Sequence, residues 1–81
     1  MKLPRDVSGT ELVHSLHRLG YEVVHQVGSH AQLAVTHNGR HKLTIPMHHA
    51  LRVGTLEGIL NAVGRHLGVD RDRVVALIFG D

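Results

Sequence analysis

Apolar residues recur with a helical period near the start of the chain. They fall at i, i+4 and i+7, which gives one narrow apolar face: Leu12, Leu16 and Leu19. Ser8 and Glu11 have the spacing of a capping box, in which each side chain accepts a hydrogen bond from the backbone amide of the other residue. Gly20 is well placed to end the helix. We therefore predict a first helix between Ser8 and Gly20.

The second half of the chain contains two further helical patterns. A helix from about Gly54 has apolar residues at i, i+3, i+4, i+7 and i+11: Leu56, Ile59, Leu60, Val63 and Leu67. Asp70 is a good N-cap for a short third helix over residues 71–79. Its apolar residues exceed what one narrow face requires: Val74, Val75, Leu77 and Ile78. This helix either packs on the first two helices or presents a patch to a second chain, forming a homo-oligomer.

Three segments between the helices have the β-branched composition of strands: residues 21–27, 30–36 and 41–45. Gly28-Ser29 separates the first two, and Asn38-Gly39 is a strong signal for a two-residue hairpin loop between the others. The elements together predict an α+β domain, with a three-stranded antiparallel sheet between the first two helices and an extra short C-terminal helix.

The apolar phase of the strands argues against a two-residue loop at Asn38-Gly39. That loop would place the apolar residues of the two strands on opposite faces, whereas one more residue pairs Val35 with Leu43 and Leu33 with Ile45. Because a one-residue slip turns every side chain to the other face, we predict an odd-length or bulged connection.

The same phase assigns the polar residues of these strands to one open face: His30, Gln32, Lys42 and Thr44. A histidine beside a lysine on such a face suits a phosphodiester. His37 and His41 would lie opposite each other near the hairpin tip, where a metal could bridge them. We favour solvated tip residues there and predict no metal site.

Length and composition indicate one small domain, with a core over about residues 8–67 and an extension over about residues 68–81. The chain has 81 residues, no cysteine, one Tyr, one Phe and no Trp, so the core is built from Leu, Ile and Val. It has neither the apolar run of a signal peptide nor that of a membrane span. We expect a cytoplasmic protein with no membrane association and no cofactor.

Charge is distributed unevenly along the chain. No acidic residue lies between Glu22 and Glu57, a window that holds Arg40, Lys42, Arg52 and six of the nine histidines. Such a surface suits a phosphate-rich partner such as RNA, and a solvated polar sheet face is the alternative. The start of the second helix, from Arg52 to Thr55, offers free amides, a hydroxyl and a guanidinium for a phosphate; an ordinary capped helix is the alternative there.

Gly28-Ser29-His30 is the candidate catalytic motif. Gly28 can adopt a positive φ and Ser29 can hydrogen-bond to neighbouring backbone, so the pair can fix how His30 enters its strand while leaving it in solvent. An imidazole held in this way is suited to proton transfer. His48, in the loop released by Pro46, is the best candidate for a second proton-transferring group, and Ser29 is a further possible catalytic or RNA-contacting residue.

Several motifs in the same order resemble the HicA (YcfA-like) toxin family over roughly residues 8–63: Gly28-Ser29-His30, then a hairpin, Thr44-Ile45-Pro46-Met47-His48, and Gly54-Thr55-Leu56 followed by Ile59-Leu60. The resemblance implies an α-β-β-β-α domain similar to a double-stranded-RNA-binding fold. It also implies a toxin that cleaves mRNA without a metal, with His30 as catalytic histidine and a HicB antitoxin as partner. Two departures are Leu33, where the family commonly has an aromatic residue, and the extension after Gly68.

The implied reaction starts with removal of a ribose 2′-hydroxyl proton by His30. Lys42, Arg52 and the amides near Thr55 would stabilise the developing charge, with Arg40 as a further phosphate contact. The alternative is a non-catalytic RNA-binding module in which His30 and Lys42 only contact phosphates and 2′-hydroxyls. A structural domain that offers its last helix to a protein partner is a third reading, but it leaves the acid-free window unexplained.

Overall fold

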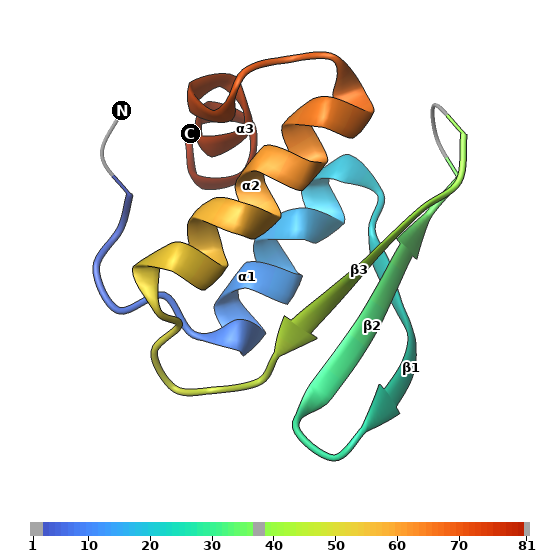
Figure 1. Ribbon diagram of the computed structural model, residues 1–81, viewed down its shortest axis with the longest axis vertical. Coiled ribbons are helices and arrows are strands. Elements are labelled where there is room, and N and C mark those ends of the chain that lie inside the picture. The colour runs from blue at the N-terminus through green and yellow to red at the C-terminus, as the bar shows by residue number, and fades with distance from the viewer. Residues whose placement is uncertain (1–2, 37–38, 81) are drawn as a thin grey trace.

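The computed structural model describes residues 3–36 and 39–80. Its elements follow the predicted order (Figure 1): α1 (Gly9–Leu16), the 3₁₀ turn η1 (His17–Leu19), β1 (Glu22–Val27), β2 (His30–Val35), β3 (His41–Pro46), α2 (Val53–Leu67) and α3 (Arg71–Phe79). The predicted α+β class is confirmed, and the arrangement is consistent with a double-stranded-RNA-binding-like α-β-β-β-α unit plus one helix. No helix of the described residues is long and apolar enough to cross a membrane.

The predicted ends of the first helix are confirmed. Glu11 N donates to Ser8 Oγ at 3.0 Å and Ser8 N donates to Glu11 Oε1 at 3.4 Å, which completes the capping box. Gly20 has a φ of 88°, and the next amide, of Tyr21, donates to Leu16 O at 3.3 Å. This is the hydrogen bond of a Schellman motif. The α-helical part ends at Leu16, and η1 makes up the last turn.

The sheet has the order β1-β2-β3, with both neighbouring pairs antiparallel. The predicted faces are confirmed. Leu33, Val35, Leu43 and Ile45 are buried, and the predicted open-face residues are exposed: His30, Gln32, Lys42 and Thr44. The predicted partners are wrong by two residues, because Leu33 pairs with Leu43 and Val35 with His41. A shift of two keeps every side chain on its face, so the apolar phase cannot distinguish the two registers. The connection over residues 36–40 sets the register, with Gly39 at a φ of 89°.

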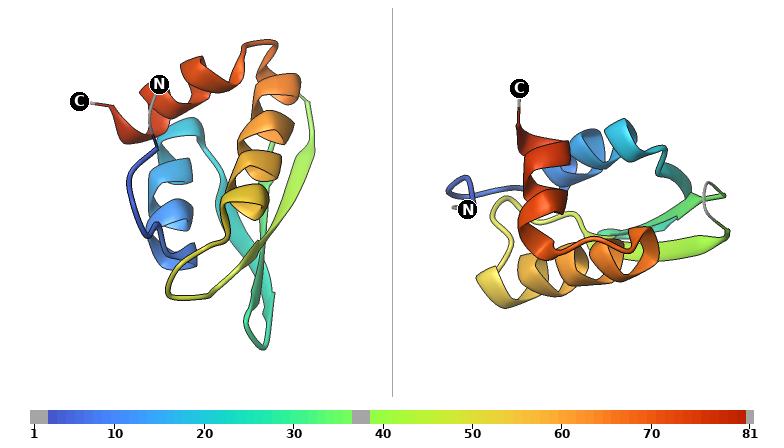
Figure 2. Two further views of the ribbon diagram at one scale, coloured as in Figure 1. Left: turned by 60° about the vertical axis from the view of Figure 1, so that its left-hand side comes forward. Right: turned by 90° about the horizontal axis from the view of Figure 1, so that it is seen from above.

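One face of the sheet is covered by α1 and α2, and the other is open (Figures 1 and 2). The covered face and the helices share one buried apolar cluster, which includes Leu12, Leu16, Leu33, Ile45 and Leu60. Strand β1 lies at the edge, and all its residues are exposed. A bulge between Val23 and His25 interrupts its pairing with β2. Sheets with one solvated face and one packed face are the usual antiparallel arrangement.

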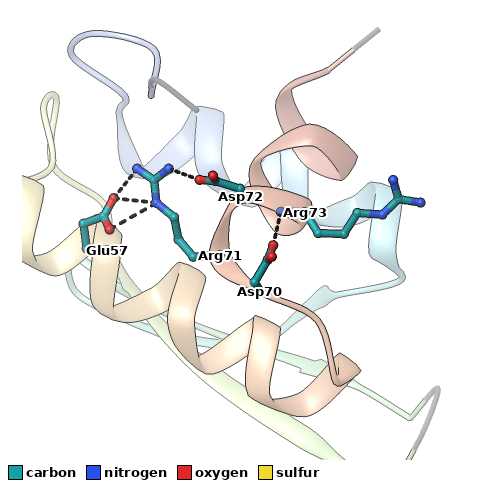
Figure 3. Close-up of polar contacts among 5 residues, drawn as sticks. All are labelled: Glu57, Asp70, Arg71, Asp72 and Arg73. Carbon is teal, nitrogen blue, oxygen red and sulfur yellow. Dashed lines mark hydrogen bonds and ion pairs between the residues drawn. The ribbon is translucent and has the colours of Figure 1, made fainter.

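Helix α3 packs on its own chain, which confirms the first of the two alternatives for it. Val74, Val75 and Ile78 are buried in the common core. Figure 3 shows Arg71 at the start of α3 reaching Glu57 on α2, with the closest approach at 2.6 Å, and Asp72 at 2.7 Å. At the other end of α3, Arg18 in η1 donates to the carbonyl of Gly80 at 2.5 Å. These contacts fix the helix across α1, η1 and α2.

Gly64 permits this packing. A Cβ at this position would lie 2.7 Å from the carbonyl oxygen of Val69, which belongs to the turn that leads into α3. The amide of Val69 also donates to Gly64 O at 2.9 Å, with Gly68 in the left-handed conformation. A larger residue at 64 would therefore displace the extension.

Candidate active site on the open face of the sheet

His30 lies directly after the tight turn that joins β1 to β2. Val27 pairs with His30, and Gly28 has a φ of 55° while Ser29 keeps a negative φ, as in a type II′ turn. The hairpin projects beyond the helices (lower part of Figure 1), and both Ser29 and His30 are exposed. The backbone thus fixes where His30 enters the strand, while solvent and ligands can reach its ring.

A loop from β3 to α2 is attached to this turn. Met47 N donates to Ser29 O at 2.5 Å, and Gly9 N donates to His48 O at 2.9 Å. A Cβ on Gly9 would clash with the carbonyl oxygen of Pro46 and lie 2.7 Å from Met47 Cα, so glycine allows the start of α1 to touch this loop. The structure therefore places the backbone of His48 beside the turn that carries His30. The His48 side chain is exposed.

The open face consists of three rows of side chains that run across the strands. The register gives the rows Val27–His30–Pro46, then His25–Gln32–Thr44, then Glu22–Ala34–Lys42. Consecutive rows are two residues apart along β2 and β3, or about 7 Å, and the bulge makes His25 and Glu22 three residues apart on β1. Glu22, at the edge of the third row, is the only acidic residue in these rows.

Lys42 shares the open face with His30, as predicted, but is not beside it. His30 is in the first row and Lys42 in the third, so they are about 13 Å apart along the sheet. Their side chains are therefore not neighbours on the sheet. The same register places Arg40, which precedes β3, at the end remote from His30. The expected position of Lys42 beside His30 is corrected, because it was inferred from the face and not from the position along the strands, and the role of Lys42 as an RNA contact stays a prediction.

The start of α2 follows the loop that leaves β3 and is the lower end of that helix in Figure 1. Arg52 is the N-cap residue and makes no side-chain capping hydrogen bond, so the first-turn amides are not occupied by a cap. Arg52 and Gly54 are exposed, and Thr55 is half-buried. The structure thus separates the predicted residues into three groups. Ser29 and His30 lie at the β1–β2 turn with the backbone of His48 attached beside it, Arg52 and Thr55 lie at the start of α2, and Arg40 and Lys42 lie at the end of the sheet remote from His30.

His41 is not the solvated tip residue that we predicted. Its Nδ1 lies 2.6 Å from the hydroxyl of the fully buried Tyr21, and its ring stacks on His66 with centroids 4.6 Å apart and an angle of 11° between the planes. Burial lowers the pKa of His41, and the charges of His66 and Arg65 lower it further. Burial also raises the pKa of Tyr21 to about 12. His37, the other half of the predicted pair, lies outside the described residues.

The alternation of inward and outward side chains along β3 could have identified His41 as an inward residue. Residues 41, 43 and 45 point the same way along β3, so an inward Leu43 and Ile45 require an inward His41. Within the described ranges, no group of three or more His, Asp or Glu side chains is arranged to hold a metal ion.

The comparison with protein families identifies the domain. A family model described as the HicA toxin of bacterial toxin–antitoxin systems matches residues 9–64, from the start of α1 through the sheet and into α2. The chain belongs to the HicA toxin family. HicA toxins pair with antitoxins, and members of the family are typically mRNA interferases. Comparison with the curated proteins and comparison with the solved structures each gave no match.

Two features of this HicA chain can now be placed. Leu33 is fully buried under the helices and points away from the open face, so an aromatic residue here would be a core residue and could not stack on a base. Helix α3 lies beyond the matched residues and packs on η1, α1 and α2 without touching the open face. The extension therefore supports the fold and leaves the site accessible.

Proposed function

We propose that this HicA chain is an endoribonuclease that cleaves mRNA without a metal, that His30 is its general base, and that a HicB-type antitoxin neutralises it. The observation that carries the proposal is the position of His30 in a chain of this family. It is exposed at a projecting hairpin turn, held by turn geometry and next to a second histidine-bearing loop. The acid-free sequence around it favours a phosphate-rich substrate.

The chemical step that we propose is an internal transfer. Neutral His30 takes the proton of a ribose 2′-hydroxyl, and that oxygen attacks the adjacent phosphorus. The bond from phosphorus to the 5′-oxygen of the next nucleotide breaks, and this oxygen takes up a proton. The products are one fragment with a 2′,3′-cyclic phosphate and one with a 5′-hydroxyl. A positioned general base contributes about 10²–10⁴-fold to such a rate.

We assign the remaining roles to other predicted residues. His48 is our candidate for the proton donor to the leaving oxygen, because its backbone is attached to the start of α1 beside the Ser29 turn. Ser29 contributes through its carbonyl, which anchors the loop. Arg52 and the first-turn amides of α2, with Thr55, are our candidates for stabilising negative charge at phosphorus. Lys42 is two rows from His30, and we assign it to the bound RNA away from the scissile bond.

The test is cleavage of a labelled single-stranded RNA in the presence of EDTA. We compare the wild type with His30→Ala and use His14→Ala as a matched control, because His14 is exposed on α1, on the other side of the sheet from the open face. We expect cleavage by the wild type and by His14→Ala, and loss of cleavage with retained RNA binding in His30→Ala. Equal cleavage by His30→Ala and the wild type would refute the assignment.

A non-catalytic RNA-binding module of the same fold remains the second candidate. One observation favours it: within the described residues, the ring of His30 has no hydrogen-bond partner that would orient it as a base. RNA binding without cleavage in the wild type and in His30→Ala would select this function, as would the absence of toxicity on expression. Both candidates predict binding that weakens with salt, so binding alone does not separate them.

A further inference from the structure

A cavity opens on the sheet at the end remote from His30, where β2 and β3 run into their connection. It has a volume of about 330 Å³. Its lining includes the apolar side chains of Val24 and Ala34 and the cations Arg40 and Lys42. Val24 lies at the β1 bulge and is 58% exposed. The size is at the lower end of the range for small-ligand pockets.

The charges of this cavity are available to a ligand. Arg40 and Lys42 are both exposed, and neither makes an ion pair or a side-chain hydrogen bond with any described residue. The nearest acid on the open face is Glu22, which lies two strands from Lys42 in the same row, about 10 Å away. The cavity therefore combines an apolar wall with two free positive charges.

We infer that this cavity is a subsite for one nucleotide of the RNA that flanks the scissile phosphate, with the base against Val24 and Ala34 and a phosphate at Arg40 and Lys42. The inference rests on the proposed function for the direction of the RNA across the sheet. The distance of about 13 Å between the rows of His30 and Lys42 places the two phosphates at different nucleotides. The guanidinium of Arg40 can also stack on a base.

The chain has few aromatic side chains on which an RNA base could stack, so other groups that can hold a base matter more. RNA-binding domains usually hold unstacked bases on aromatic side chains. Here Tyr21 is buried beneath the sheet, Phe79 lies in α3, and the chain has no Trp. Apart from the imidazoles of His25 and His30, the open face offers a base only aliphatic and guanidinium groups, and the cavity at Val24 and Arg40 has both.

The test measures binding of a single-stranded RNA of about twelve nucleotides. Every protein carries His30→Ala, so that the RNA stays intact. We compare the double variant Arg40→Gln/Lys42→Gln with Arg5→Gln/Arg73→Gln, which removes the same charge from exposed positions on the N-terminal segment and α3. The subsite predicts roughly tenfold weaker binding for the first pair, from two exposed charge contacts. The slope of log affinity against log salt should fall in magnitude by about 1.4.

Val24→Ser tests the apolar wall separately. We expect roughly two- to fivefold weaker binding with no change in the salt slope, because the lost contact is uncharged. Equal binding by the two double variants, no effect of Val24→Ser, or no RNA binding by the parent protein would overturn the subsite. The proposed RNase activity is tested by a separate experiment, which measures RNA cleavage by the wild type. Weaker binding in the Arg40 and Lys42 variant supports the subsite even if the wild type does not cleave RNA.

Discussion

Replacement of Gly9 by alanine tests how α1 is joined to the loop beside the candidate active site. The added Cβ would clash with the carbonyl oxygen of Pro46 and lie 2.7 Å from Met47 Cα, and both groups are backbone that cannot rotate away. Such overpacking costs about 1–3 kcal/mol. Alanine is favoured over glycine in a helix by up to about 1 kcal/mol. The net prediction for Gly9→Ala is a loss of about 1–2 kcal/mol in the free energy of unfolding.

Urea denaturation of Gly9→Ala and Gly58→Ala measures this effect. Gly58 is a matched control in a helix: it is exposed in α2, and a Cβ there would meet no heavy atom within 4 Å. Gly58→Ala should raise the free energy of unfolding by about 0.5–1 kcal/mol. The close contact between α1 and the loop would be refuted if Gly9→Ala were as stable as the wild type, or more stable, while Gly58→Ala behaved as predicted.

Three further substitutions test other parts of the account. Gly28→Ala should cost about 1–2 kcal/mol by urea denaturation, because the φ of 55° is unfavourable for alanine; a variant as stable as the wild type would argue against the left-handed turn. The lowered pKa of His41 means that folding favours its neutral form, so its contribution is complete above about pH 6.5 and is lost as the pH falls through the lowered value. His41→Leu should leave the buried hydroxyl of Tyr21 unpaired and lower stability at pH 7.5, and its deficit against the wild type should shrink at pH 5.5; a constant deficit would contradict the lowered pKa. Arg71→Gln should lower the Tm by breaking the contacts with Glu57 and Asp72, whereas Arg73→Gln, whose side chain points away from this cluster in Figure 3, should not; equal Tm values would contradict a role for the pair in holding α3.

The helices could be predicted from the sequence because their signals are local. Ser8 and Glu11 are three residues apart and contact only each other's backbone, so their spacing is sufficient to place the start of α1. Gly20, Gly68 and Asp70 act within one turn in the same way. Alternation along β2 and β3 likewise assigned the open face, because it depends only on which residues are apolar.

The positions along the sheet could not be predicted from these signals. A register shift of two residues leaves the faces unchanged, so the sequence did not reveal that Lys42 is two rows from His30. The partners of His41 are Tyr21, just before β1, and His66 in α2, both at least twenty residues away along the chain. The need for glycine at positions 9 and 64 arises from close contacts with backbone outside their own helices. Only the folded arrangement brings these groups together.

The ends of the RNA fragments provide the most direct test of His30 as the general base for a 2′-hydroxyl. A labelled RNA is incubated with the wild type in EDTA, and the termini of the products are identified by mass spectrometry, with His30→Ala in parallel. The account predicts 2′,3′-cyclic phosphate and 5′-hydroxyl ends from the wild type, and none from His30→Ala. Fragments with 3′-hydroxyl and 5′-phosphate ends, or the same products from the variant, would contradict it.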